Sequence, residues 1–311
     1  MTFLKLIRFK NLLMVLLIMI LTKYALIDHY YETQFLNTPL FFIACLSILC
    51  LTAAGYVVND ILDVQTDQIN KPEKLYIGTS ISLRKAWTLY IILTVIGLIA
   101  CFYVIHTKSM SFDYLIAYSA TILLLFLYSK YFKRLPLIGN LVIAFFCAFV
   151  IYIVFELNDI PQKSSGGFFG FLANFGNSIG LFIAILGYAI FSFLTTLIRE
   201  MIKDIEDIDG DHNMRMKTLP IVLGVKRSRN VVIFISLIFA LLLIVFIKAI
   251  FEDSKGIFLG LYFTILILLP FLLFIYKLWS ASTKKHFHSL SNLMKLIMLF
   301  GILSMGIFKF I

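Results

Sequence analysis

The chain has 311 residues, of which 61% are hydrophobic and only 14% are charged, and its mean hydropathy is +0.98. A soluble globular domain is roughly half apolar and about one-quarter charged, and no soluble fold of this length could bury so much apolar surface. The composition therefore excludes a cytosolic enzyme, a disordered chain and a secreted disulfide scaffold. It predicts an integral membrane protein.

Nine runs of about 20 apolar residues predict helices that can cross a hydrocarbon layer of about 30 Å. They lie near residues 12–27, 40–58, 85–105, 114–128, 137–157, 177–198, 230–251, 257–279 and 292–311. The runs lack the alternation of apolar and polar residues that is typical of a membrane β-barrel. The sequence thus predicts an all-α, polytopic membrane protein.

The distribution of basic residues predicts the orientation of these spans in the membrane. When the flanks are assigned to alternate sides, 20 Lys and Arg residues fall on the side of the N-terminus and 5 on the other, while Lys23 and Lys295 lie inside spans. Short cytoplasmic loops carry the excess of Lys and Arg in membrane proteins. We therefore expect a multi-pass cell-membrane protein with a cytoplasmic N-terminus. This orientation explains the net charge of +10 better than nucleic-acid binding does.

Two polar segments on the expected cytoplasmic side share one spacing of aspartates. The triplets, which follow the second and sixth spans, are Asp60, Asp63, Asp67 and Asp204, Asp207, Asp211. On one continuous helix this spacing places the carboxylates within about 60° of arc. Such charges at the negative end of a helix require a cation. Mg²⁺ binds carboxylates and completes its shell with water and phosphate oxygens, so the pattern predicts Mg²⁺ sites.

Three other interpretations of the acidic segments fit the sequence less well. A single triplet would favour a solvated acidic helix end, but two triplets of identical spacing at equivalent helix ends favour a shared site. An EF-hand loop with Gly210 at its sixth position would place Ile205 at its first, where it cannot ligate Ca²⁺. The residues after Asp209-Gly210 do not match the signature of CDP-alcohol phosphotransferases. The five histidines have no ligand spacing and are expected in loops.

Basic residues accompany both triplets. They are Lys71, Lys74, Lys130, Lys133, Arg134, Arg199 and Lys203. Each one alone is explained by the cytoplasmic excess of positive charge. Together with carboxylates and Mg²⁺ they favour binding of a diphosphate. The sequence predicts a ligand that carries phosphate at the cytoplasmic face and a long hydrocarbon tail in the membrane.

Three segments of the chain resemble the UbiA-type intramembrane prenyltransferases. Residues 59–72 have the form Asn-Asp-x-x-Asp-x-x-x-Asp-x-x-Asn-x-Pro and resemble the first Asp-rich motif of that family. Residues 199–220 resemble its second motif, and residues 128–140 resemble the stretch after its fourth helix. Residues 8–11 resemble its Arg-Pro-x-Asn start more weakly, because Phe9 replaces the proline. Lys74-Leu75 stands where the family has Arg-Pro.

The resemblance implies one prenyltransferase domain over residues 1–311, with nine helices around a central cavity and cytoplasmic Asp-rich segments near 59–74 and 199–220. It implies Mg²⁺-dependent transfer of a prenyl group from a polyprenyl diphosphate to a lipophilic acceptor in the membrane. The six aspartates of the triplets would hold metal. The residues implied to act catalytically on the diphosphate are Lys133, Tyr128, Arg199 and Lys203. The residues implied to contact substrate are Asn59, Asn70, Lys71, Lys74, Arg8 and Asn11.

The acceptor is predicted from one run of sequence. Residues 203–211, Lys-Asp-Ile-Glu-Asp-Ile-Asp-Gly-Asp, most resemble the branch of the family that prenylates geranylgeranylglyceryl phosphate. An aromatic quinone precursor, of the hydroxybenzoate or naphthoate type, is the alternative acceptor. A non-catalytic protein that binds or transports isoprenoid phosphates is a further alternative. Transporters place charges near the membrane midplane, whereas these charges gather at one face.

Overall fold

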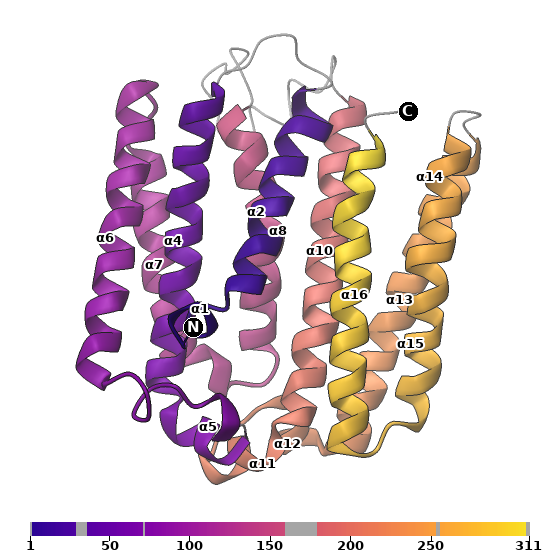
Figure 1. Ribbon diagram of the computed structural model, residues 1–311. Coiled ribbons are helices and arrows are strands. Elements are labelled where there is room, and N and C mark those ends of the chain that lie inside the picture. The colour runs from indigo at the N-terminus through magenta and orange to yellow at the C-terminus, as the bar shows by residue number, and fades with distance from the viewer. Residues whose placement is uncertain (1, 29–35, 71, 159–178, 253–255, 309–311) are drawn as a thin grey trace. The chain divides into compact units, whose positions relative to one another are not determined.

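The computed structural model describes residues 2–28, 36–70, 72–158, 179–252 and 256–308. These residues are helical almost throughout (Figure 1), and among them only an isolated bridge between Ile77 and Ile81 has β geometry. The helices before residue 159 are α1 (Thr2–Leu6), α2 (Phe9–Leu21), η1 (Thr22–Ile27), α4 (Thr38–Leu62), α5 (Val64–Asn70), η2 (Pro72–Lys74), α6 (Leu83–Thr107), α7 (Asp113–Lys130), η3 (Phe132–Arg134) and α8 (Ile138–Asn158). Those that follow are α10 (Ile179–Glu206), α11 (Ile208–Asn213), α12 (Leu219–Leu223), α13 (Val225–Glu252), α14 (Ile257–Tyr262), η6 (Phe263–Leu268), α15 (Leu269–Ser280) and α16 (Lys284–Phe308).

Nine helices within the described ranges are long and apolar enough to cross a membrane. Their bounds are Phe9–Ile27, Thr38–Leu62, Leu83–Thr107, Asp113–Arg134, Ile138–Asn158, Gly180–Glu206, Val225–Glu252, Ile257–Ser280 and Lys284–Ile307. Each of them overlaps one of the predicted spans. The predicted all-α membrane fold with nine spans is therefore confirmed.

The chain divides into two compact units. Unit 1 contains residues 1–16, 36–142 and 207–222, and unit 2 contains residues 17–35, 143–206 and 223–311. The two Asp-rich motifs contribute differently to these units, because the first lies wholly in unit 1 whereas the second is shared between them. The expected single domain over the whole chain stays a prediction.

In unit 1, α4 packs along α6 and also contacts α7 (Figure 1). Gly97 on α6 makes room for both neighbours, because an added Cβ would lie 3.3 Å from the Ser47 carbonyl oxygen on α4 and 2.3 Å from the Tyr118 hydroxyl on α7. The Ser47 hydroxyl donates to the Gly97 carbonyl at 2.8 Å, and the Tyr118 hydroxyl donates to the Ser47 carbonyl at 2.9 Å. These bonds satisfy polar groups that lipid could not satisfy.

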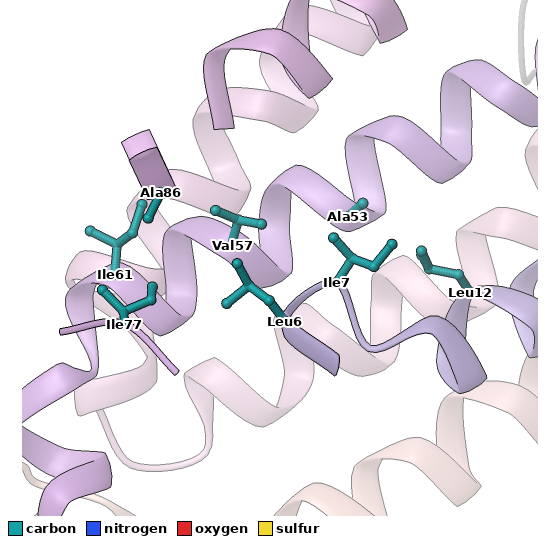
Figure 2. Close-up of a cluster of buried hydrophobic side chains, with 8 residues drawn as sticks. All are labelled: Leu6, Ile7, Leu12, Ala53, Val57, Ile61, Ile77 and Ala86. Carbon is teal, nitrogen blue, oxygen red and sulfur yellow. The ribbon is translucent and has the colours of Figure 1, made fainter. Parts of the chain in front are cut away.

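The N-terminal segment is anchored to unit 1 by buried apolar side chains. Figure 2 shows this cluster, in which Leu6, Ile7 and Leu12 lie with residues of α4 such as Ala53 and Val57. Leu6 and Val57 are completely buried. The close packing of these side chains holds α1 and the start of α2 against α4.

In unit 2, α10 packs against α16 and α13, and α15 packs against α16 and α13. A buried hydrogen bond of 2.9 Å joins the Tyr188 hydroxyl on α10 to the Ser304 hydroxyl on α16. The eighth span changes to π-helical geometry in η6, just before Pro270. Proline lacks the N–H for a regular helical bond and clashes with the preceding turn, and a π segment accommodates such an interruption.

The expectation that the histidines lie in loops is wrong for the four that the structure describes. His106 belongs to α6, His212 to α11, and His286 and His288 to α16; His29 lies outside the described residues. α6 and α16 extend beyond their apolar runs into polar sequence, which contains His106, His286 and His288, whereas His212 lies in the short helix α11 that follows α10.

Candidate active site

Both Asp-rich motifs break their helix at the second aspartate. α4 ends at Leu62, and Asp63 follows with φ −99° and ψ 2° before α5 begins at Val64. α10 ends at Glu206, and Asp207 follows with φ −97° and ψ 10° before α11 begins at Ile208. The expected unbroken stripe of three carboxylates is therefore wrong. Asp side chains compete with regular backbone hydrogen bonding, which favours such breaks.

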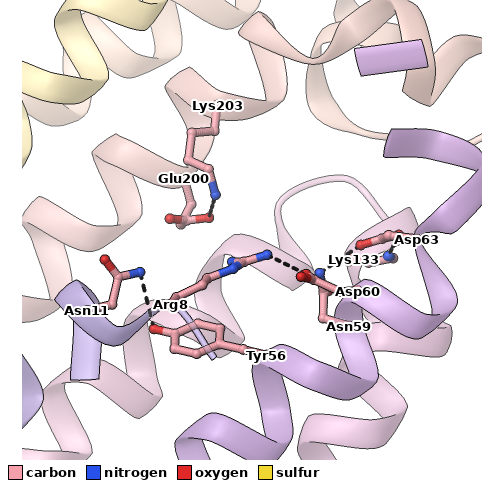
Figure 3. Close-up of polar contacts among 9 residues, drawn as sticks. All are labelled: Arg8, Asn11, Tyr56, Asn59, Asp60, Asp63, Lys133, Glu200 and Lys203. Atoms are coloured by element: carbon pink, nitrogen blue, oxygen red, sulfur yellow. Dashed lines mark hydrogen bonds and ion pairs between the residues drawn. The ribbon is translucent and has the colours of Figure 1, made fainter. Parts of the chain in front are cut away.

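The first motif brings carboxylates and basic side chains into direct contact (Figure 3). The Arg8 guanidinium donates to Asp60 Oδ1 at 2.8 Å. The Lys133 ammonium pairs with Asp63 Oδ1, while the Asn59 amide donates to Asp63 Oδ2 at 2.8 Å. The Asp60 and Asp63 side chains are only 16% and 13% exposed, so these pairs are less screened by water than surface pairs.

Both the backbone conformation and the side-chain contacts of Arg8 fix its position. Its φ of 51° lies in the left-handed region, which is uncommon for residues other than glycine. The guanidinium lies over the Tyr56 ring with its carbon 4.9 Å from the ring centre, a favourable cation–π arrangement. The Asn11 amide is 3.5 Å from the Tyr56 hydroxyl. The sequence motifs did not include Tyr56, although it precedes Asp60 by four residues and so shares its helix face.

Lys133 lies in η3, directly after α7. Gly139 allows the chain to fold back there, because a Cβ at that position would lie 2.7 Å from the Lys133 Cα. Lys133 also interacts electrostatically with Asp60 and Asp211. The predicted residue Tyr128 lies half-buried in the last turn of α7.

The C-terminal part of the second motif joins the first motif within unit 1. α11 packs against α5, and the Gly210 N–H donates to the Asn70 side-chain oxygen at 2.9 Å. The Lys217 N–H donates to the Arg134 carbonyl at 2.8 Å. Asp211 is only 8% exposed. Asn70, expected to contact substrate, thus uses its carboxamide oxygen to hold the second motif.

The remainder of the second motif lies on α10 in unit 2. Arg199 and Lys203, both predicted to act on the diphosphate, pair with Glu200 at 2.6 and 2.9 Å, and Figure 3 shows the Lys203 pair. Glu206 is buried and lies 2.8 Å from the ring of His288 on α16. No sequence pattern indicates this last pair, because Glu206 and His288 are far apart along the chain.

The donor types suit Mg²⁺, but the side chains are not gathered as a ready-made site. Within the described ranges, no three His, Cys, Asp or Glu side chains cluster as a metal-ligand set. Asp60 and Asp63 offer hard carboxylate oxygens, and each already pairs with a basic side chain. Lys71 lies outside the described residues, as does the side chain of Lys74. The ligand roles of all six aspartates stay predictions.

Comparison with known proteins identifies a family profile that covers most of the chain. The profile described as the UbiA prenyltransferase family matches residues 12–299. Digeranylgeranylglyceryl phosphate synthase from Sulfolobus acidocaldarius (strain ATCC 33909 / DSM 639 / JCM 8929 / NBRC 15157 / NCIMB 11770) is 33% identical over 204 residues. That alignment covers 66% of this chain and 65% of the relative, so the match spans just under two thirds of the relative.

Solved structures share the fold over nearly the whole chain. A structure of a digeranylgeranylglyceryl phosphate synthase in membranes has a TM-score of 0.64 and 26% identity, and it covers 99% of this chain and 98% of its own. A UbiA homologue from Archaeoglobus fulgidus, bound to GPP and Mg²⁺, has a TM-score of 0.58 and 16% identity, with coverage of 98% and 100%. At that identity the second likeness concerns the fold alone.

Proposed function

The chain belongs to the UbiA prenyltransferase family, and we propose that it transfers a polyprenyl group from an isoprenyl diphosphate to geranylgeranylglyceryl phosphate, with Mg²⁺ as cofactor. The family and the nine apolar helices make it a multi-pass membrane enzyme of the prenyltransferase class, as the motifs predicted. The acceptor is proposed because the Sulfolobus relative and one similar structure are digeranylgeranylglyceryl phosphate synthases.

One observation carries the proposed reaction. Asp60 and Asp63 lie beside Arg8 and Lys133, and Asp211 interacts electrostatically with Lys133. The arrangement offers oxygen ligands for a metal and cationic donors for phosphate within one compact unit. Both are needed because a diphosphate leaves readily only when its negative charge is neutralised.

We assign the metal to the six aspartates of the two triplets. Mg²⁺, when bound to these carboxylates, would supply positive charge that neutralises a diphosphate; the Archaeoglobus homologue is bound to GPP and Mg²⁺. Lys133, aided by Tyr128, neutralises the departing diphosphate oxygen, and Arg199 and Lys203 supply further charge. Asn59 orients Asp63, to which it already donates. Asn11, Asn70, Lys71 and Lys74 are proposed to support substrate binding.

The chain's apolar side chains protect the reaction from water. When the bond between the prenyl carbon and the diphosphate oxygen breaks, the bonding electrons leave with the diphosphate. The allylic cation that remains is attacked by the acceptor hydroxyl, whose proton passes to the released diphosphate. Apolar and aromatic surroundings exclude water and stabilise this cation. We propose that the two units form one prenyltransferase domain over residues 1–311.

The distribution of basic residues supports an orientation. With 20 Lys and Arg residues on one set of flanks and 5 on the other, the positive-inside rule assigns the larger set to the cytoplasm. We therefore propose that the N-terminus and both Asp-rich motifs face the cytoplasm. The diphosphate would then be bound from the cytoplasmic side, while its tail lies in the membrane.

The function is tested by product analysis with the purified full-length protein. It is incubated with labelled geranylgeranyl diphosphate and, separately, geranylgeranylglyceryl phosphate, hydroxybenzoate or dihydroxynaphthoate, and the products are identified by mass spectrometry. We expect a doubly geranylgeranylated glycerophosphate that disappears with EDTA and returns with Mg²⁺. Prenylation of an aromatic acid alone would support the quinone-precursor alternative. Binding of the diphosphate without any product would support a non-catalytic protein.

A further inference from the structure

We propose that Arg8 and Lys133 are resident counter-ions of the first motif, which Mg²⁺ must displace from Asp60 and Asp63. On this account metal binding is an exchange of cations rather than the filling of a preformed site. The inference rests on the proposed function, because it concerns how the same motif takes up its metal.

The N-terminal segment positions Arg8 for its ion pair with Asp60. Leu6 and Ile7 are anchored in the buried cluster with α4 (Figure 2), and the left-handed backbone of Arg8 turns the chain directly after them. The guanidinium then lies over Tyr56 and donates to Asp60. A strained conformation persists only where the surroundings determine it, and the contacts on both sides of Arg8 do so here.

A different part of the chain positions Lys133 for its ion pair with Asp63. The close packing at Gly139 fixes the backbone of Lys133, whose side chain is only 11% exposed and reaches Asp63. The two oxygens of Asp63 are divided between Lys133 and the Asn59 amide. The N-terminal segment thus places a cation beside Asp60, and the segment after α7 places one beside Asp63 (Figure 3).

A metal ion and a basic side chain compete for the same carboxylate oxygens. Mg²⁺ coordinates carboxylate oxygens closely, so the bound ion would lie beside the Lys133 ammonium and the Arg8 guanidinium, and repulsion between these like charges favours their departure from the carboxylates. A largely buried carboxylate without a counter-ion is costly, and the pairs with Arg8 and Lys133 supply counter-ions to Asp60 and Asp63. Once displaced, the same cations remain near the motif and are available to phosphate oxygens.

Removal of a resident cation should strengthen Mg²⁺ binding in the absence of diphosphate. Isothermal titration calorimetry with MgCl₂ should give a roughly three- to tenfold tighter dissociation constant for Lys133→Met and for Arg8→Gln than for the wild type. Lys133→Arg, which keeps the charge, should bind Mg²⁺ as the wild type does. Lys130→Met is the matched control, because Lys130 lies in the same region but is exposed and lies over the Tyr131 ring.

A second readout uses the unmodified protein. Mg²⁺ should raise the rate at which a lysine acylating reagent modifies Lys133 relative to Lys130, measured by mass spectrometry, because the ammonium is released from Asp63. Inorganic pyrophosphate added with Mg²⁺ should lower that rate again. This measurement does not depend on how the variants fold.

Two results would overturn the inference. One is Mg²⁺ binding in Lys133→Met and Arg8→Gln that is unchanged or weaker than in the Lys130→Met control. The other is a Lys133 modification rate that Mg²⁺ does not raise. Neither readout involves prenyl transfer, so a failure of the proposed function leaves them unaffected, and their failure leaves the product assay unaffected.

Discussion

At the scale of single residues, Asp63 is held by one partner from its own helix, Asn59, and by one from a distant part of the chain, Lys133. The spacing of acidic and amide residues singled out Asn59, Asp60 and Asp63, and the structure joins Asn59 to Asp63 across one helical turn. Lys133 lies 70 residues from Asp63 along the chain. Only the fold brings these two together, so periodicity could not have paired them.

Asn70 has one role implied by its motif and makes a different contact in the structure. The resemblance implied contact with substrate, and that role stays a prediction. Its carboxamide oxygen accepts from the Gly210 N–H, and its side chain fills the space beside that glycine. The reason for a glycine at position 210 is therefore packing, which a sequence pattern alone does not reveal.

We predict that Gly210→Ala destabilises the protein. The new Cβ would lie within 2.4–2.6 Å of the Asn70 carboxamide atoms, so α11 or Asn70 must shift and the hydrogen bond between them is lost. Overpacking of this kind costs about 1–3 kcal/mol, and thermal unfolding of the purified protein should show a lower midpoint. Turnover should fall with it, because α11 carries Asp211.

Gly187→Ala is the matched control for this prediction. Gly187 lies within α10, and a Cβ there would meet nothing within 4 Å, so alanine should be neutral or slightly stabilising in the helix. Equal unfolding midpoints for the two alanine variants would contradict the role assigned to the contact between Gly210 and Asn70.

At the scale of helices, long apolar runs predicted the spans well because lipid requires continuous backbone hydrogen bonding. The run at 40–58 became α4 (Thr38–Leu62), and the run at 114–128 became α7 (Asp113–Lys130). The polar ends were less predictable. Hydropathy cannot show that α4 and α10 stop just before Asp63 and Asp207, since the same spacing is compatible with a continuous helix.

The helix breaks at Asp63 and Asp207 have the same place in the two motifs. Each places its second aspartate between a membrane-spanning helix and a short helix, α5 or α11. The Asp67 N–H donates to the Asp63 carbonyl at 2.8 Å, and the Asp211 N–H donates to the Asp207 carbonyl at 3.3 Å. The two motifs therefore repeat a local conformation as well as a spacing, which supports the proposal that they have equivalent roles.

At the scale of the whole molecule, the proposed orientation makes a prediction about accessibility. Single cysteines replacing Gln68 and Asp209, both exposed, should be protected in intact cells from a membrane-impermeant thiol reagent. They should react once the membrane is opened, because the basic flanks assign both to the cytoplasm. Ser111, exposed in the loop between α6 and α7, is the matched control, and a cysteine there should react from outside.

The opposite labelling pattern would contradict this orientation. Reaction of the cysteine at position 68 or 209 from outside, with protection at position 111, would reverse the assignment of sides. Reaction of only one of the two motif positions from outside would separate the motifs and remove the basis for a shared site.

The central claim, that both Asp-rich motifs carry Mg²⁺-dependent prenyl transfer, is tested most directly by the turnover of three alanine variants. Asp63→Ala and Asp207→Ala should each lower turnover of geranylgeranyl diphosphate by roughly 10²-fold or more at saturating Mg²⁺. Asp209→Ala should retain turnover, because Asp209 is exposed and outside the triplet. Thermal unfolding in EDTA checks that each variant is folded. Near-normal turnover by folded Asp63→Ala or Asp207→Ala protein would contradict the account.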